Sequence, residues 1–196
     1  VQTCALPISG WTRIYLEVDQ FGLAWWLGSV AVMALIHDAW FYWTHRLLHH
    51  RLFFKRFHAI HHASLNPTPW ASLSFHPVEE LLSFGFFPLM VFVLPFHPAA
   101  LAAFFVLMFI GNVTGHSGFE FGRLLPWSRY FSSPVHHNLH HTRVTKNFGL
   151  YTNWWDLALG TFEDHGYLEI YQRLGKPMDS PGADQGSSRE IGRAHV

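Results

Sequence analysis

Residues 21–50 of the chain read FGLAWWLGSVAVMALIHDAWFYWTHRLLHH, and this stretch decides the class of fold. It contains no charged residue from Phe21 to Ile36, and its second half includes His45 and His49. A single helix over these residues is about 45 Å long, whereas the hydrocarbon of a bilayer is about 30 Å thick. We therefore predict one long membrane helix whose last turns hold His45 and His49 outside the lipid.

A second apolar block, residues 81–113, contains no Lys, Arg, Asp or Glu. Pro95 and Pro98 divide it, and proline is tolerated at the first position of a helix. The two halves with their flanks, 76–94 and 98–115, have about 18 or 19 residues each, which barely spans a membrane. The pattern therefore predicts a helical hairpin that enters the membrane and returns to the side where the first helix ends.

The composition agrees with a membrane protein. Hydrophobic residues make up 49% of the chain and charged residues 13%, which is about half of the usual charged share. The net charge is zero, so nothing indicates a nucleic-acid partner. Arg51, Lys55 and Arg56 follow the first helix, and such a basic cluster favours the cytoplasmic side of a membrane.

Eight histidines form a four-spaced pair and two HxxHH triplets, the second of which we expect on a short helix that begins at Pro134. They are His45, His49, His58, His61, His62, His137, His140 and His141. On a helix, residues i, i+3 and i+4 share a face, so each triplet directs at least two imidazoles to one point. Neutral imidazole is the commonest nitrogen ligand of transition metals. The clusters therefore predict a metal site on one membrane face.

These motifs, in this order, are similar to those of the fatty acid hydroxylase and sterol desaturase superfamily. The similarity extends from about Ile36 to Phe162 and comprises DAWFYWTHRLLH (38–49), FHAIHH (57–62), HPVE (76–79), HNLHH (137–141), NFG (147–149), and WD (155–156) near Gly160 and Thr161. Members are integral membrane oxidoreductases that use O2 at a histidine-rich, usually di-iron, centre on the cytoplasmic side. The resemblance implies that the eight clustered histidines are metal ligands.

Other histidines have separate expectations. Some family members have a further HxxxH pair where this chain has Asn112 and His116, so His76 and His116 are candidates for additional metal ligands or for residues hydrogen-bonded to ligands. His50 and His136 adjoin proposed ligands but point about 100° away on a helix. We expect neither of these two to bind metal.

Three polar residues are candidates for orienting the ligand imidazoles through hydrogen bonds: Asp38, Asn147 and Asp156. Asp38 precedes His45 by two helical turns, and the alternative for it is a helix cap or an ion pair with Arg46. Tyr42 and the tryptophans near the ends of the apolar segments are typical of an interfacial aromatic belt. His97 is expected at the tip of the hairpin, on the opposite side of the membrane.

We therefore predict an all-α integral membrane protein with a long first helix, a membrane hairpin and a cytoplasmic, histidine-rich, metal-binding helical cap. The resemblance implies hydroxylation or desaturation of a membrane lipid, such as a sterol or fatty acyl chain, with O2 and two iron ions. No dinucleotide fingerprint or CxxCH motif occurs, so we expect an external electron donor.

Two alternatives remain for the histidines. A bis-histidine haem site needs one ligand from each of two facing helices and leaves the triplets unexplained. The second alternative is a zinc-dependent membrane hydrolase or a non-catalytic metal-binding protein, because zinc also binds imidazole. The sequence has no HExxH motif, which disfavours one class of metalloprotease.

The two ends of the chain, residues 1–9 and 190–196, can be encoded by reverse-complementary DNA that resembles a sequencing adaptor, and we expect neither to be native. Residues 175–189 are rich in Pro, Gly, Ser and Asp and are expected to form a flexible tail. The fatty acid hydroxylase-like membrane domain is then residues 10–174, and we expect the native protein to begin upstream of Gly10.

Overall fold

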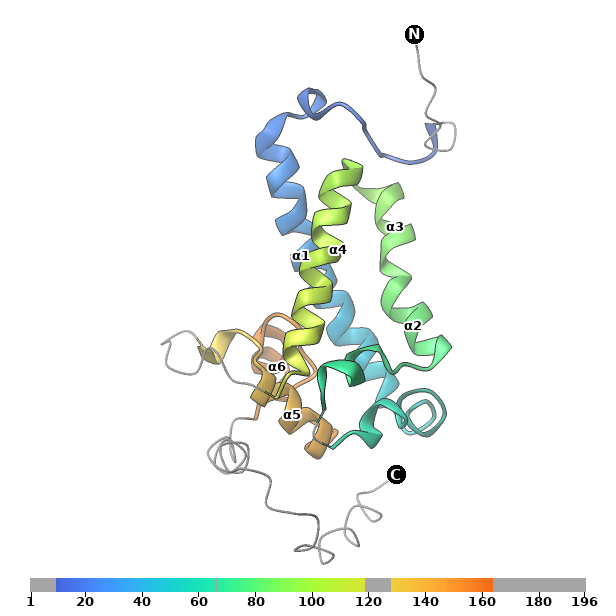
Figure 1. Ribbon diagram of the computed structural model, residues 1–196, viewed down its shortest axis with the longest axis vertical. Helices are drawn as coiled ribbons and strands as arrows, with labels where there is room; N and C mark the ends of the chain where they lie inside the picture. The colour runs from blue at the N-terminus through green and yellow to red at the C-terminus, as the bar shows by residue number, and fades with distance from the viewer. Residues whose placement is uncertain (1–9, 66, 119–127, 164–196) are drawn as a thin grey trace, which may run out of the picture.

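The computed structural model describes residues 10–65, 67–118 and 128–163, which form helices and connecting turns (Figure 1). The helices are α1 Gly22–Leu48, α2 Pro77–Phe84, α3 Phe86–Val93, α4 Pro98–Gly115, α5 Pro134–Arg143 and α6 Trp154–Leu159. Within these ranges, β-pairing is limited to isolated bridges. The predicted helical class is confirmed, whereas the predicted tail and the two adaptor-like ends lie outside the described residues.

Helix α1 confirms the predicted long first helix. It has 27 residues and buries one face, on which Ser29, Met33 and His37 follow one another at four-residue steps, as expected for neighbours on a helix. The helix begins at Gly22, whose φ of 77° favours glycine. Its last turn ends with the N–H of His49 bonded to the carbonyl of His45, so the first histidine pair lies at the end of the helix.

The predicted hairpin corresponds to α2 and α3 followed by α4, which runs antiparallel to them in Figure 1. Its first arm is interrupted at Gly85, between α2 and α3. Pro88 has no N–H to donate to the carbonyl of Phe84, and a Cβ on Gly85 would lie 2.6 Å from the carbonyl oxygen of Leu81. His97 caps α4 by accepting a hydrogen bond at Nδ1 from the N–H of Ala99, at the end of the hairpin opposite α5 and α6 (Figure 1).

A cluster of buried apolar side chains joins the long helices. Its members are Met33, Phe86, Phe96, Phe104 and Met108, from α1, α3, α4 and the turn before α4. The outer faces of the same helices expose large apolar residues, among them Leu27, Leu35 and Ile110. By length and composition, α1 and α4 can each cross a membrane, and their exposed apolar faces suit contact with lipid.

Residues 128–163, with α5 and α6, lie at the end of the molecule where α1 and α4 finish (Figure 1). Asp38 attaches this segment to α1, because its carboxylate accepts hydrogen bonds from the N–H groups of Tyr151 (3.1 Å) and Thr152 (3.0 Å) and from the Thr152 hydroxyl. Tyr42 makes a second attachment. Its hydroxyl lies 2.9 Å from that of Thr161, and its side chain is fully buried. The expectation that Tyr42 belongs to an interfacial belt is therefore wrong, because the 128–163 segment covers it.

Candidate metal centre

Nine buried or half-buried histidines form two neighbouring groups in which the ring nitrogens converge. The five-histidine group consists of His45, His49, His58, His62 and His140, and the four-histidine group consists of His61, His116, His137 and His141. In each group the potential ligand atoms all lie within 4.8 Å of one another. The groups adjoin, since the ring centroids of His62 and His141 are 4.6 Å apart.

Each HxxHH triplet is divided between the two groups. His58 and His62, four residues apart, enter the five-histidine group, whereas His61 enters the four-histidine group. In the second triplet the four-spaced pair His137 and His141 enters the four-histidine group, and His140 enters the other. This arrangement agrees with the prediction that each triplet directs at least two imidazoles to one point.

The local backbone of the two triplets differs. The second triplet lies on α5, which begins at Pro134 as expected and ends at Arg143, followed by Val144 with a φ of 49°. The first triplet is not on an α-helix: a π-helical turn, Phe54–His58, is followed by a 3-10 turn, His61–Ala63. The four-residue step from His58 to His62 is nevertheless short enough for their Nε2 atoms to lie 3.0 Å apart.

The distances between ring nitrogens match ligands of a common ion. In the five-histidine group, His58 Nε2 lies 3.2 Å from His45 Nε2, and His62 Nε2 lies 3.1 Å from His140 Nε2. Nitrogens bound about 2.0–2.1 Å from a metal at tetrahedral to right angles are about 2.9–3.4 Å apart. In the four-histidine group, His137 Nε2 lies 2.9 Å from that of His116 and 3.1 Å from that of His141.

Backbone carbonyls determine which nitrogen bears the proton in three of these rings. The Nδ1 atoms of His45, His140 and His116 lie 3.0, 2.7 and 2.8 Å from the carbonyl oxygens of Phe148, Lys146 and Asn112, respectively. A carbonyl only accepts hydrogen bonds, so each Nδ1 donates and each Nε2 retains its lone pair. These lone pairs point into the groups. A cation bound in each group would accept several such lone pairs at once, which supports a metal site without reference to any relative.

The surroundings keep the histidines in the neutral form that binds metal. Burial lowers the pKa of His141 to about 3, and the adjacent His116 and His45 act in the same direction. Burial likewise holds the pKa of His137 and His140 well below the ordinary value. Because a protonated imidazole has no lone pair to give, these environments favour ligands over charged side chains.

The loop at residues 146–149 supplies the two carbonyls that bind His45 and His140. Asn147 adopts a φ of 56°, and its side chain donates hydrogen bonds to the carbonyls of His136 and Glu163. Asp156 accepts hydrogen bonds from the N–H groups of Phe148 (2.9 Å) and Gly149 (2.8 Å). A side chain on Gly149 would collide with the carbonyl of Thr152, which explains the glycine.

Asn147 and Asp156 thus lie one step behind the imidazoles, through the backbone that they hold, and their role in orienting metal ligands stays a prediction. Asp38 is placed differently. Its described hydrogen bonds go to Tyr151 and Thr152 rather than to a histidine or to Arg46, so it positions the 128–163 segment as a whole.

Of the two additional candidates, the structure places only His116 with the clustered histidines. His116, at the C-terminal end of α4, belongs to the four-histidine group. His76 lies outside both groups, caps α2 through its Nδ1 and contacts the ring of Phe57. His50 and His136 also lie outside the groups.

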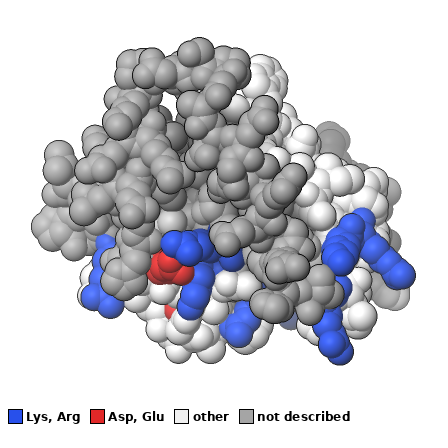
Figure 2. Space-filling model, turned by 90° about the horizontal axis from the view of Figure 1, so that it is seen from below, with Lys and Arg blue, Asp and Glu red and all other residues white. Residues whose placement is uncertain are grey.

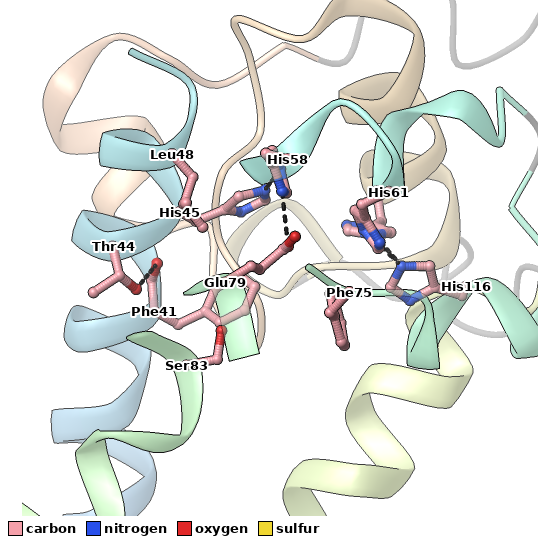
Figure 3. A pocket seen from close by; sticks show the side chains of 11 residues that line it. Phe41, Thr44, His45, Leu48, His58, His61, Phe75, Glu79, Ser83 and His116 are labelled. Atoms are coloured by element: carbon pink, nitrogen blue, oxygen red, sulfur yellow. Dashed lines mark hydrogen bonds and ion pairs between the residues drawn. The ribbon is translucent and has the colours of Figure 1, made fainter. Parts of the chain in front are cut away.

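Sequence reasoning missed Glu79. This carboxylate on α2 is buried, and its Oε1 lies 2.7 Å from His58 Nδ1 (Figure 3). The HPVE motif included it, but the adjacent Glu80 is exposed, and a sequence does not tell which of two neighbouring glutamates is buried. The carbonyls of Lys146, Phe148 and Asn112 were also missed, because a backbone acceptor leaves no mark in residue identity.

A small cavity of about 20 Å³ touches both groups (Figure 3). Such a volume accommodates about one water-sized molecule. His45 and His58 line it from one group, and His61, His116 and His137 from the other. Its remaining wall is mainly apolar or uncharged, from Phe41, Thr44, Leu48, Phe75 and Ser83, with Glu79 as the one carboxylate among its described lining residues.

Basic side chains lie at the end of the molecule that contains the histidines. Figure 2 views the molecule from this end and shows several Lys and Arg side chains on it. Arg51 and Arg56 follow the last turn of α1, and Arg143 and Lys146 lie in α5 and in the loop after it. Among the described residues, the segment from α2 to α4 has no Lys or Arg.

Comparison with known proteins identifies the class. The fatty acid hydroxylase family matches residues 30–161, which contain all nine histidines of the two groups and the Asn147–Gly149 loop. The chain belongs to this family.

Several sterol-modifying enzymes are similar to the chain. It is 33% identical over 155 residues to a delta(7)-sterol 5(6)-desaturase of Gibberella zeae, covering 79% of this chain and 47% of the relative. It is 33% identical over 167 residues to lathosterol oxidase of Mus musculus (84% and 55%) and 33% identical over 149 residues to methylsterol monooxygenase 1 of Rattus norvegicus (74% and 50%). The chain thus spans about half the length of these relatives. No solved structure matches it.

Proposed function

We propose that this protein oxidises a membrane lipid with O2, by hydroxylation or desaturation, at a centre of two metal ions held by the two histidine groups. The observation that carries the proposal is the convergence of imidazole lone pairs in two adjoining groups around one cavity. The similarity to enzymes named sterol desaturase, lathosterol oxidase and methylsterol monooxygenase supports a lipid, and specifically a sterol-like, substrate.

Iron is the metal that fits this chemistry, and the nine histidines are the residues that would hold it. When bound, a pair of iron ions supplies the redox chemistry by which O2 attacks an unactivated C–H bond. In hydroxylation one oxygen atom enters the lipid and the other leaves as water, with two electrons and two protons from outside. In desaturation the lipid loses two hydrogen atoms and O2 becomes two molecules of water with the same external supply. An electron-donor partner therefore belongs to the proposal.

The chain's own residues orient the ligands and limit access of water. Carbonyls of residues 146 and 148 hold the rings of His140 and His45, so little rearrangement is needed when a cation binds. Phe41, Leu48 and Phe75 form an apolar wall beside the cavity. A small, largely apolar cavity admits a molecule the size of O2 and excludes bulk water, which protects reactive species.

We further propose that α1 and the α2–α4 hairpin lie in the membrane and that the histidine groups face the cytoplasm. The exposed apolar faces of α1 and α4 support membrane insertion. The basic residues around the histidine end support its cytoplasmic side, because Lys and Arg near membrane helices favour that side.

The substrate's approach is proposed to follow α1. An open apolar groove of about 400 Å³ lies along this helix, lined by Ile36, Ala39, Trp40, Trp43, Thr44 and Leu47. Thr44 also lines the cavity between the histidine groups. This shared residue connects the lipid-facing surface of α1 with the metal centre, so the apolar part of a lipid in the groove would reach the reacting position from within the bilayer.

The test is lipid analysis of a sterol-producing host that expresses the chain. We expect a lipid that gains one oxygen atom or loses two hydrogen atoms and that disappears with His61→Ala. His50→Ala is the matched control, since His50 is a neighbouring histidine outside both groups. Protein purified without oxygen should contain iron. Zinc in both groups together with no O2 consumption on any lipid would instead support the zinc-protein alternative.

A further inference from the structure

Glu79 distinguishes the two histidine groups. Its Oε1 lies 2.7 Å from His58 Nδ1, and both side chains are almost completely buried. Among the nine histidines of the two groups, His58 is the one with a described carboxylate within ion-pair distance. The four-histidine group has no such partner in the described part of the chain, and its His116 bonds a backbone carbonyl.

A carboxylate that accepts a hydrogen bond from a metal-bound imidazole holds that ring more strongly than a backbone carbonyl does. Hydrogen bonds to an ionised acceptor are shorter and about twice as strong as neutral ones, and a low-dielectric interior strengthens them further. A carboxylate behind a metal-bound imidazole fixes the ring's orientation and raises its basicity as a ligand. His58 therefore differs from His45 and His140, which donate to carbonyls of the 146–148 loop.

The position of Glu79 suits this role. It is the third residue of α2, after the proline at the helix start, where the dipole of a helix favours negative charge. Figure 3 shows its carboxyl group between α2 and His58, at the edge of the cavity. The adjacent Glu80 is exposed, so the two glutamates offer a buried residue and its matched control.

We propose that Glu79 is a positioning residue that holds His58 toward the five-histidine group and thereby makes the two metal positions chemically unequal. This inference rests on the proposed dimetal centre. The ion in the five-histidine group is held by more imidazoles and has a buried carboxyl group hydrogen-bonded behind one of them. It should therefore be released more slowly than its neighbour and be oxidised more readily.

The test measures zinc release to a colorimetric chelator in two backgrounds of the full chain. His141→Ala, combined with His137→Ala, leaves two imidazoles in the four-histidine group, and His49→Ala, combined with His62→Ala, leaves three in the five-histidine group, so each background weakens one site. In the His141→Ala background we expect Glu79→Gln to accelerate release of the remaining zinc by about 10- to 100-fold. In the His49→Ala background the same substitution should leave the release rate unchanged, and Glu80→Gln should change neither background.

Cobalt(II) provides a readout that a purely structural role would not alter. In the His141→Ala background, Glu79→Gln should shift the visible absorption of bound cobalt, whereas in the His49→Ala background the spectrum should stay the same. Glu79→Asp keeps the carboxyl group but shortens the side chain, so its zinc-release rate and cobalt spectrum should lie between those of the unaltered protein and of Glu79→Gln. It gives a second measurement if the Glu79→Gln variant does not fold.

The outcomes separate this inference from the proposed function. Equal effects of Glu79→Gln in both backgrounds, or an effect no larger than that of Glu80→Gln, would overturn the role of Glu79 alone. If the unaltered protein bound no metal ion at all, the proposed dimetal centre itself would be overturned.

Discussion

The five-histidine and four-histidine groups use the same sequence motifs but are supported differently. In the five-histidine group, His45 bonds the carbonyl of Phe148, 103 residues further along the chain, His58 bonds Glu79, and His140 bonds the carbonyl of Lys146, 6 residues after it. In the four-histidine group, His116 bonds the carbonyl of Asn112, one turn earlier on its own helix. The hydrogen bonds behind the first group therefore depend on how α2 and the 146–148 loop are placed, whereas in the second group the end of α4 holds His116 by itself.

Removal of two ligands from one group at a time is the most severe way to test whether the two groups are separate sites. The double substitutions His58→Ala/His62→Ala and His137→Ala/His141→Ala should each abolish lipid oxidation, because two ions are needed, while each retains metal in the other group. Elemental analysis should then show about half of the metal of the unaltered protein. Loss of all metal from either variant would mean that the groups form a single site, and His50→Ala should match the unaltered protein.

Asp156 tests the dependence of the five-histidine group on the distant loop. Asp156→Ala leaves the buried N–H groups of Phe148 and Gly149 without their acceptor, which we expect to lower the free energy of unfolding by about 3 kcal/mol. Metal should be lost first from the five-histidine group, because the loop's carbonyls orient His45 and His140.

Denaturant unfolding and metal analysis in the His141→Ala background measure both effects of Asp156→Ala. Asp19→Ala, at an exposed acid outside the site, is the control. Equal metal loss from the four-histidine group, measured in the His49→Ala background, would contradict the assignment of the loop to one group.

Acid should destabilise both histidine groups of the metal-free protein, because burial is the main cause of the lowered histidine pKa in each group. Burial lowers the pKa of His141 to about 3 and also lowers that of His140, whereas an unfolded histidine has a pKa of about 6.5. Below about 6.5 the unfolded chain binds protons that the folded chain cannot. Stability should therefore fall with decreasing pH, by up to about 1.4 kcal/mol per pH unit for each such histidine.

Thermal unfolding of the metal-free protein between pH 7 and pH 5 measures this slope. Adding back zinc at pH 7 should raise the unfolding temperature, and the gain should shrink as the pH falls, because ligand histidines must be deprotonated. A metal-free protein of constant stability over this range would mean that the imidazoles are not buried together.

The smallest expected effect concerns the groove on α1, which lies outside both groups. Ala39→Trp fills the groove and should raise the apparent KM for the lipid about fivefold or more, the equivalent of about 1 kcal/mol, without altering metal content. Ala31→Trp, at an exposed position on the same helix, is the control. Equal KM values for the two variants would remove the groove from the substrate's path.

Some parts of this arrangement follow from sequence patterns, and others cannot. The long α1 and the four-residue pairing of histidines depend on local periodicity, and the structure agrees with them. Asp38 and Tyr42 were expected elsewhere because their partners, Thr152 and Thr161, lie more than a hundred residues away in the chain. Local spacing contains no information about such tertiary contacts.

The division of each HxxHH triplet between the two groups has a consequence for how such chains can change length. The steps from His58 to His62 and from His137 to His141 keep each four-spaced pair in one group. The third histidine of each triplet, His61 or His140, belongs to the other group. One residue inserted inside a triplet would misplace ligands of both groups at once. Insertions in the connections between the triplets would leave these short steps intact. Length variation in proteins of this construction should therefore accumulate between the triplets and be excluded from within them.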